Sequence, residues 1–60
     1  MKVMVVDDNV IVRLGLRSVL NRIDAVDEVI EANDAFSALE ASHTHSPDII
    51  LLDVSMPPGR

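Results

Sequence analysis

The sequence contains no cysteine, tryptophan or tyrosine, and its only aromatic residue is Phe36. Without cysteine the chain has neither a disulfide framework nor a cysteine-based zinc site. With so few aromatic side chains, a core has to be built from Val, Ile, Leu and Met, which favours the aliphatic packing of α/β proteins. Sixty residues is also near the lower size limit of a domain, because a chain this short buries only about 60% of its unfolded surface.

Basic residues are scarce as well, with five Lys and Arg against ten Asp and Glu and a formal net charge of −5. This sign is wrong for binding a phosphate backbone, so these sixty residues are not expected to contact nucleic acid. The apolar run after Lys2 ends at Asp7, which is too short for a signal-peptide core or a membrane span. We therefore expect a cytoplasmic protein.

Two short apolar runs are each closed by acidic residues. Val3–Val6 is followed by Asp7 and Asp8, and Ile49–Leu52 is followed by Asp53. Both runs predict strands that are buried on both faces of a parallel sheet. The segments between them predict a helix near 9–23, a strand near 26–32 and a helix near 34–45. This alternation predicts a parallel sheet with right-handed crossover connections.

The first predicted helix has one face expected to pack on the sheet, formed by Val12, Leu16, Val19, Leu20 and Ile23. Its opposite side carries Arg13, Arg17, Ser18, Asn21 and Arg22. Three further apolar residues lie outside the packing face, namely Val10, Ile11 and Leu14. They are either the rim of a contact surface or the singly exposed aliphatic side chains that every protein carries.

Acidic residues flank Val29 and Ile30, so the second strand is expected at the edge of the sheet, where charge discourages aggregation. Asn33 and Asp34 offer an N-cap for the second helix, and Ser46-Pro47 is expected to end it.

Ligands bind beyond the carboxyl ends of parallel strands. If the first and third strands are neighbours, Asp7, Asp8 and Asp53 converge there. Three carboxylates in one cleft repel one another unless a cation lies among them, and magnesium is the cation that prefers such oxygen ligands. A carboxylate beside this ion can act as a nucleophile and form an aspartyl phosphate.

Three segments carry a resemblance to a known family: Val5–Asn9, Ala32–Leu39 and Leu51–Pro57. Together they resemble the receiver domains of two-component response regulators, in register over all sixty residues. The resemblance implies a flavodoxin-like, doubly wound parallel sheet, of which this chain holds the first β-α-β-α-β portion with strand order 2-1-3.

The resemblance also implies a site. Asp53 would accept a phosphoryl group from a sensor kinase phosphohistidine. Mg²⁺ would be bound directly by Asp8 and Asp53, by Asp7 largely through water, and by the backbone carbonyl of Ser55. The family uses its first helix for kinase docking, which favours a contact role for Val10, Ile11 and Leu14. Such a domain is not a conventional enzyme, although it assists its own phosphoryl transfer.

The segment Arg13–Arg17 is similar to regulators that carry a C-terminal helix-turn-helix domain. We therefore expect the full-length protein to regulate transcription and to bind DNA only through that domain. A complete receiver has five strands, with a hydroxyl residue ending the fourth and a lysine ending the fifth, whereas Lys2 is the only lysine here. Residues 1–60 thus match the N-terminal half of a receiver, as a fragment or a shortened product. Alone, this piece is expected to be inactive and to self-associate through the exposed edge of its third strand.

Other protein classes that could fit this pattern each require particular residues. Phosphatases of the haloacid-dehalogenase type need an acid two residues beyond the nucleophile, and Ser55 occupies that position. A nucleotide-binding βαβ domain needs a glycine-rich loop or a Walker lysine, and the sequence has neither. Asp7 and Asp8 could instead be solvated turn residues or a helix cap. The remaining alternative is a receiver-like interaction domain that is not phosphorylated.

Overall fold

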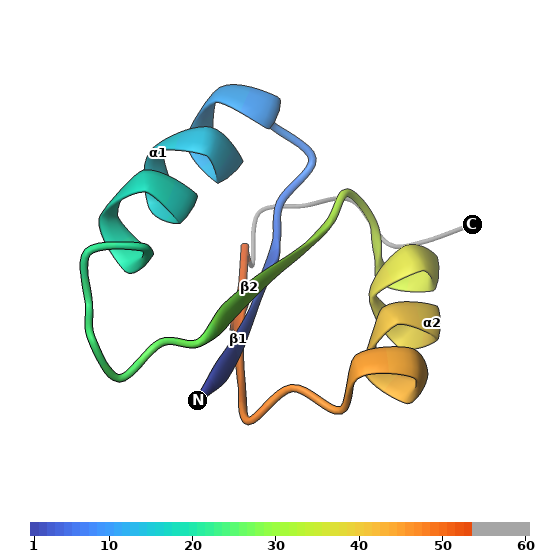
Figure 1. Cartoon of the computed structure of the whole chain (residues 1–60). Coiled ribbons are helices and arrows are strands. Elements are labelled where there is room, and N and C mark those ends of the chain that lie inside the picture. The colour runs from blue at the N-terminus through green and yellow to red at the C-terminus, as the bar shows by residue number, and fades with distance from the viewer. Residues whose placement is uncertain (54–60) are drawn as a thin grey trace.

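The computed structural model describes residues 1–53, which alternate between strands and helices (Figure 1). The elements are β1 (Lys2–Val6), α1 (Val10–Leu20), β2 (Glu28–Ala32), α2 (Ala35–His45) and β3 (Ile49–Leu52). The strands are parallel and lie in the order β2-β1-β3, with α1 and α2 on opposite sides of the sheet. This arrangement confirms the predicted partial flavodoxin-like fold and its strand order.

The central strand β1 is the best buried part of the chain. Its residues Val3–Val6 are at most 2% exposed. In the register of the sheet, Met4 lies between Ile30 and Ile50, and Val6 lies between Ala32 and Leu52. Because alternate residues of a strand point to opposite faces, Met4 and Val6 share one face, where they pack with Ile30, Ala32, Ala38 and Ala41. The core therefore lies between the sheet and α2, and β2 is at the sheet edge as predicted.

Strand β3 differs from the prediction. Its four residues, Ile49–Leu52, are 38% to 58% exposed, although the apolar run predicted burial on both faces. Within residues 1–53, β3 pairs with β1 alone, and a hollow of about 540 Å³ separates Leu51 from Val12 and Leu16 of α1. The apolar run predicted a strand correctly, but burial depends on what covers that strand.

Helix α1 begins after Asn9, whose Oδ1 accepts hydrogen bonds from the backbone N–H groups of Ile11 and Val12 at 2.9 and 3.3 Å. It ends at Leu20, short of the predicted end near residue 23. The expected packing face is only partly realised. Leu16 is half-buried beside the hollow, whereas Val19 is exposed.

Helix α2 starts and stops where the sequence predicts. The Asp34 carboxylate accepts a hydrogen bond from the Ser37 N–H at 2.7 Å, and this bond lowers the pKa of Asp34. The helix ends at His45, and the next residue, Ser46, caps it in a left-handed conformation with φ of 50°. Neither of the two described helices has the length and apolar character that spanning a membrane requires.

Candidate functional site

Two neighbouring parallel strands end in aspartates at the same edge of the sheet. The backbone N–H of Asp7 donates to the carbonyl of Ala32 at 3.1 Å, and the N–H of Asp53 donates to the carbonyl of Val6 at 3.0 Å. These two bonds extend the sheet ladder by one residue beyond each strand. The backbones of Asp7 and Asp53 are therefore fixed by the sheet itself.

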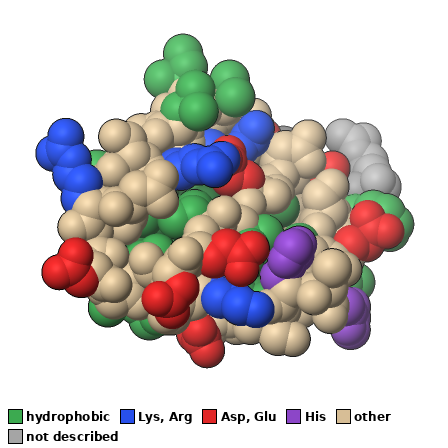
Figure 2. Space-filling view, viewed as in Figure 1, with side chains coloured by type: hydrophobic (Ala, Val, Ile, Leu, Met, Phe, Trp, Pro, Cys, Tyr) green, Lys and Arg blue, Asp and Glu red, His purple; other side chains and the backbone are tan. Residues whose placement is uncertain are grey.

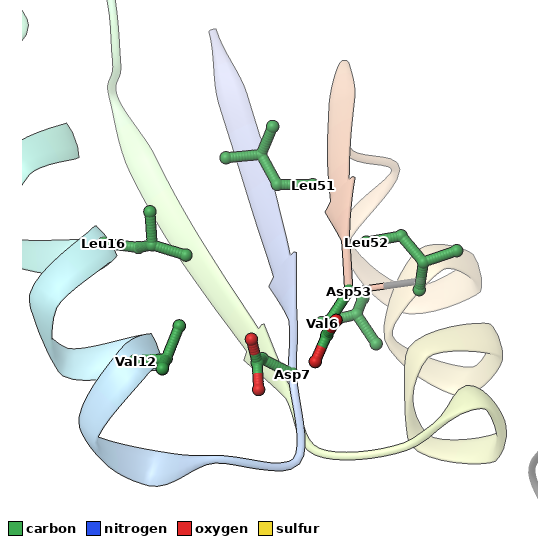
Figure 3. A pocket seen from close by; sticks show the side chains of 7 residues that line it. All are labelled: Val6, Asp7, Val12, Leu16, Leu51, Leu52 and Asp53. Atoms are coloured by element: carbon green, nitrogen blue, oxygen red, sulfur yellow. The ribbon is translucent and has the colours of Figure 1, made fainter. Parts of the chain in front are cut away.

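The carboxylates of Asp7, Asp8 and Asp53 form one cluster. Each contributes an oxygen, and these oxygens all lie within 4.8 Å of one another. Asp7 is buried, Asp8 is exposed and Asp53 is intermediate, so the cluster opens to solvent on the side of Asp8. Figure 3 shows Asp7 and Asp53 side by side at the strand ends. The sequence-based expectation that these three side chains converge agrees with the geometry.

The spacing of the cluster can be compared with what a magnesium ion requires. An octahedral ion with oxygens at about 2.1 Å places neighbouring ligands about 3 Å apart and opposite ligands about 4.2 Å apart. The observed separations, up to 4.8 Å, are close to this range. The donors are all carboxylate oxygens and their spacing is near what the ion requires, so the residues present fit a divalent ion with oxygen ligands.

The turn between β1 and α1 is held by Asp7 and Asn9. The Asn9 N–H donates to Oδ1 of Asp7 at 2.8 Å, and the Asn9 side chain caps the helix. Asn9 is therefore the helix cap, a role that the sequence alone had left open for Asp7 and Asp8. The side chain of Asp8 makes no part of that cap and lies in the acidic cluster.

The hollow beside α1 begins at the acidic cluster. It is lined by Val6, Asp7, Val12, Leu16, Leu51, Leu52 and Asp53, so all of its walls except the two aspartates are aliphatic (Figure 3). Low-dielectric walls strengthen the electrostatic interactions of charged groups at their edge. The acidic cluster therefore lies at the edge of a mostly apolar hollow.

Sequence reasoning missed a polar network on the other side of the turn. It assigned Arg13 to the solvent-facing side of its helix, but the Arg13 side chain is only 16% exposed and forms an ion pair with Glu31 of β2. Arg13 also donates to the backbone carbonyl of Asp7. The opposite charges on the helix and on the edge strand were the available signal, but sequence alone does not reveal which charges meet.

The remaining predicted site residues are Ser55 and the three apolar residues of α1. Ser55, a predicted metal ligand, lies outside the described residues. Val10, Ile11 and Leu14 are 54%, 75% and 57% exposed. Figure 2 shows hydrophobic side chains projecting at the end of the molecule where α1 begins. These three residues form an accessible apolar surface on α1.

Comparison with known proteins gives one family and a set of close relatives. The model of the response regulator receiver domain matches residues 3–60. The chain is 39% identical over 59 residues to the oxygen regulatory protein NreC of Staphylococcus carnosus and of Staphylococcus epidermidis, and 37% identical to that of Staphylococcus aureus. Each match covers 98% of this chain and 27% of the relative, so the chain spans about a quarter of these proteins. No solved structure matches significantly.

Proposed function

This chain belongs to the response regulator receiver domain family, and on that premise we propose that it is a phosphoacceptor in two-component signalling, with Asp53 as the residue that is phosphorylated. The observation that carries the proposal is the convergence of three carboxylates at the carboxyl ends of β1 and β3. In the proposed domain organisation, residues 1–60 are the N-terminal half of a receiver.

The proposed cofactor is Mg²⁺. Asp8 and Asp53 would bind it directly, with the backbone carbonyl of Ser55 as a further ligand, and the buried Asp7 would act largely through water. When bound, the ion neutralises charge that develops on the transferring phosphoryl oxygens. The spacing of the three carboxylates supports this ligand set.

The proposed reaction is an in-line phosphoryl transfer. A carboxylate oxygen of Asp53 attacks the phosphorus of a phosphohistidine, the new O–P bond forms as the N–P bond breaks, and the imidazole leaves with the electron pair of the broken bond. The backbone bond from Asp53 N–H to the Val6 carbonyl fixes the nucleophile at the strand end. The chain's own contribution is therefore mainly to position the reacting carboxylate.

The proposed phosphoryl donor is a sensor histidine kinase, and the exposed surface of Val10, Ile11 and Leu14 is its proposed docking site. The relatives are named as regulatory proteins and are about four times as long as the matched segment. We extend the proposal to the whole protein as a cytoplasmic transcription regulator that binds DNA through a further, C-terminal domain. The formal net charge of −5 on residues 1–60 agrees with DNA binding elsewhere in the protein.

Phosphorylation by a small donor tests the proposal. The natural protein that carries these residues is incubated with acetyl phosphate and Mg²⁺, and its intact mass is measured. We expect a gain of one phosphoryl group in the wild type and none in Asp53→Asn. Asp24→Asn is the matched control, because it makes the same chemical change at an exposed carboxylate in the loop before β2.

The alternative function is a receiver-like interaction domain that is not phosphorylated. A wild-type protein that gains no phosphoryl group while binding Mg²⁺ would favour this alternative. Labelling of Asp53→Asn to the same extent as wild type would contradict the assignment of Asp53.

A further inference from the structure

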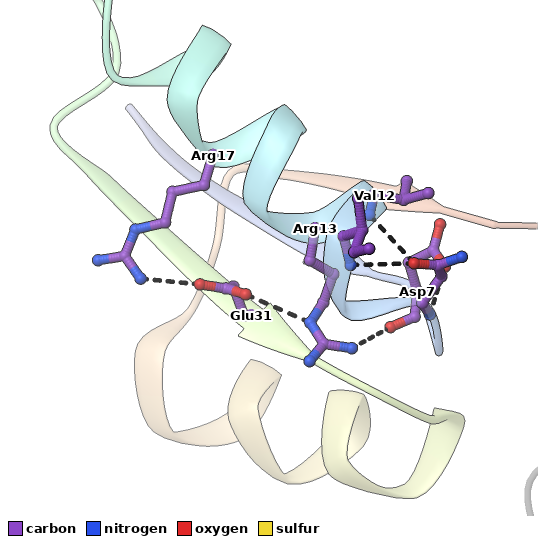
Figure 4. A network of polar contacts seen from close by, with 7 residues as sticks. Asp7, Val12, Arg13, Arg17 and Glu31 are labelled. Carbon is purple, nitrogen blue, oxygen red and sulfur yellow. Dashed lines mark hydrogen bonds and ion pairs between the residues drawn. The ribbon is translucent and has the colours of Figure 1, made fainter.

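Arg13 connects three parts of the fold. From α1, its Nη1 donates to the backbone carbonyl of Asp7 at 2.5 Å, and its Nε donates to Oε1 of Glu31 on β2 at 3.2 Å. Arg17, one turn further along α1, donates to the other Glu31 oxygen at 2.8 Å. Figure 4 shows this network running from Arg17 through Glu31 and Arg13 to the start of the acidic turn.

The network is best shielded at Arg13. The side chains of Arg13 and Glu31 are 16% and 23% exposed, whereas Arg17 is 52% exposed. An exposed ion pair contributes little because water and salt screen it, and partial burial reduces that screening. The contacts of Arg13 are therefore less screened by solvent than the ion pair of the more exposed Arg17 with Glu31.

The carbonyl that Arg13 holds belongs to the peptide joining Asp7 to Asp8. The Asp7 N–H is fixed by the carbonyl of Ala32, and the Asp7 carboxylate accepts from the Asn9 N–H. Because Arg13 donates to the Asp7 carbonyl, both the backbone N–H and the backbone carbonyl of Asp7 are hydrogen-bonded. The orientation of the next peptide, and with it the direction of the exposed Asp8 side chain, follows from that carbonyl.

We propose that Arg13 is a positioning residue for the acidic site, with Glu31 orienting its guanidinium. Arg13 fixes the Asp7–Asp8 peptide so that the Asp8 carboxylate faces those of Asp7 and Asp53. The planar guanidinium suits this task because its fork donates to the carbonyl and the carboxylate together, which a lysine ammonium on one flexible stem does not reproduce. This inference rests on the proposed function of the cluster as a Mg²⁺ site.

Three variants of the natural protein separate positioning from mere stabilisation. Arg13→Met removes the hydrogen-bond donors but keeps an apolar stem, and Arg13→Lys keeps the charge without the guanidinium fork. Arg17→Met is the matched control, because Arg17 donates to Glu31 but makes no hydrogen bond to Asp7. For each, the Mg²⁺ dissociation constant is measured by calorimetry at a temperature where the protein is folded. The melting temperature without Mg²⁺ is measured separately.

We expect Arg13→Met to raise the Mg²⁺ dissociation constant about tenfold, in line with the effect of losing a residue that orients metal ligands. Arg13→Lys should recover part of this loss, and Arg17→Met should bind Mg²⁺ nearly as the wild type does. A purely structural role would lower the melting temperature of Arg13→Met and leave its dissociation constant unchanged. That result would overturn the inference.

If Arg13→Met does not fold, Arg13→Lys decides the question. A Mg²⁺ dissociation constant above the wild-type value supports the inference. A value equal to that of the wild type overturns it, because the proposed positioning requires the guanidinium fork. A wild-type protein that binds no Mg²⁺ overturns the metal site and this inference together. Wild-type binding with an unaffected Arg13→Met overturns the positioning role alone.

Discussion

The backbone N–H of Asp53 donates to the carbonyl of Val6 at 3.0 Å, which joins the end of β3 to the end of β1. Asp7 follows Val6 directly in the sequence, so this one bond sets two aspartates next to each other from stretches of chain that are far apart. The closeness of their charges is a property of the sheet pairing. It has consequences for stability that do not depend on phosphorylation.

Asp53→Asn should stabilise the protein in the absence of divalent ions. The change removes one of three like charges whose oxygens lie within 4.8 Å. Two unit charges 4 Å apart repel by about 1 kcal/mol even in water, so a gain of about that size in the free energy of unfolding is expected. Urea unfolding in EDTA measures it, with Asp24→Asn as control. An equal gain in the control would show that net charge alone is responsible.

Mg²⁺ should raise the melting temperature of the wild type, because it binds the folded cluster and not the unfolded chain. At one hundred times the dissociation constant the expected stabilisation is about 2.7 kcal/mol. Chelation with EDTA should reverse it, and Asp53→Asn should lose most of it. Thermal unfolding over a series of Mg²⁺ concentrations gives the measurement. A melting temperature indifferent to Mg²⁺ argues against the metal site.

Acid should weaken the start of α2. The bond from the Ser37 N–H lowers the pKa of Asp34 below its ordinary 3.8. A carboxyl with a depressed folded-state pKa contributes stability that is present above pH 3.8 and is lost as the pH falls through the lower, folded-state value. Asp34→Asn keeps a capping side chain but does not titrate, so its stability should fall less over this range. Unfolding measured by circular dichroism at several acidic pH values, with Asp24→Asn as control, tests this.

Gly15→Ala should stabilise the protein. Gly15 is exposed in the middle of α1, and a Cβ added there meets no described atom within 4 Å beyond its chain neighbours and the backbone of its own helix. Alanine in a helix interior is favoured over glycine by about 0.5–1 kcal/mol. Urea unfolding gives the difference in the free energy of unfolding. Destabilisation instead would indicate that another part of the natural protein packs against this side of α1.

Ile11→Ser should slow phosphorylation by the cognate sensor kinase severalfold and leave labelling by acetyl phosphate intact. Ile11 is the most exposed residue of the apolar surface on α1, and acetyl phosphate is too small to need a docking helix. Phe36→Ser is the matched control, because it removes another exposed apolar side chain, from α2 on the other side of the sheet. Equal slowing in both variants would remove the case for docking on α1.

The topology and the convergence of the aspartates could be predicted because both follow from rules about whole elements. Apolar runs closed by acids predict parallel strands, and parallel strands that are neighbours share one carboxyl edge. The cap at Asp34 could be predicted for a similar reason, since the side chain and the backbone groups that it binds are neighbours in sequence.

The role of Arg13 could not be predicted in this way. A helical wheel assigns a residue to a face by its polarity, whereas the long Arg13 side chain turns across the end of the sheet to a backbone carbonyl and to Glu31. The exposure of β3 was missed for a different reason. Its composition is that of an interior strand, but burial is set by the elements that cover it.

The central position of β1 also constrains when the site can form. The ribosome makes β1 before β2 and β3, yet β1 pairs with both of these later strands, and its pairing with β3 waits for Ile49–Leu52. At about 5–20 residues per second, Asp7 and Asp8 emerge several seconds ahead of their third carboxylate. During that interval the nascent chain presents two of the clustered acids without Asp53, so the acidic cluster is assembled only once the third strand has been translated and has paired with β1.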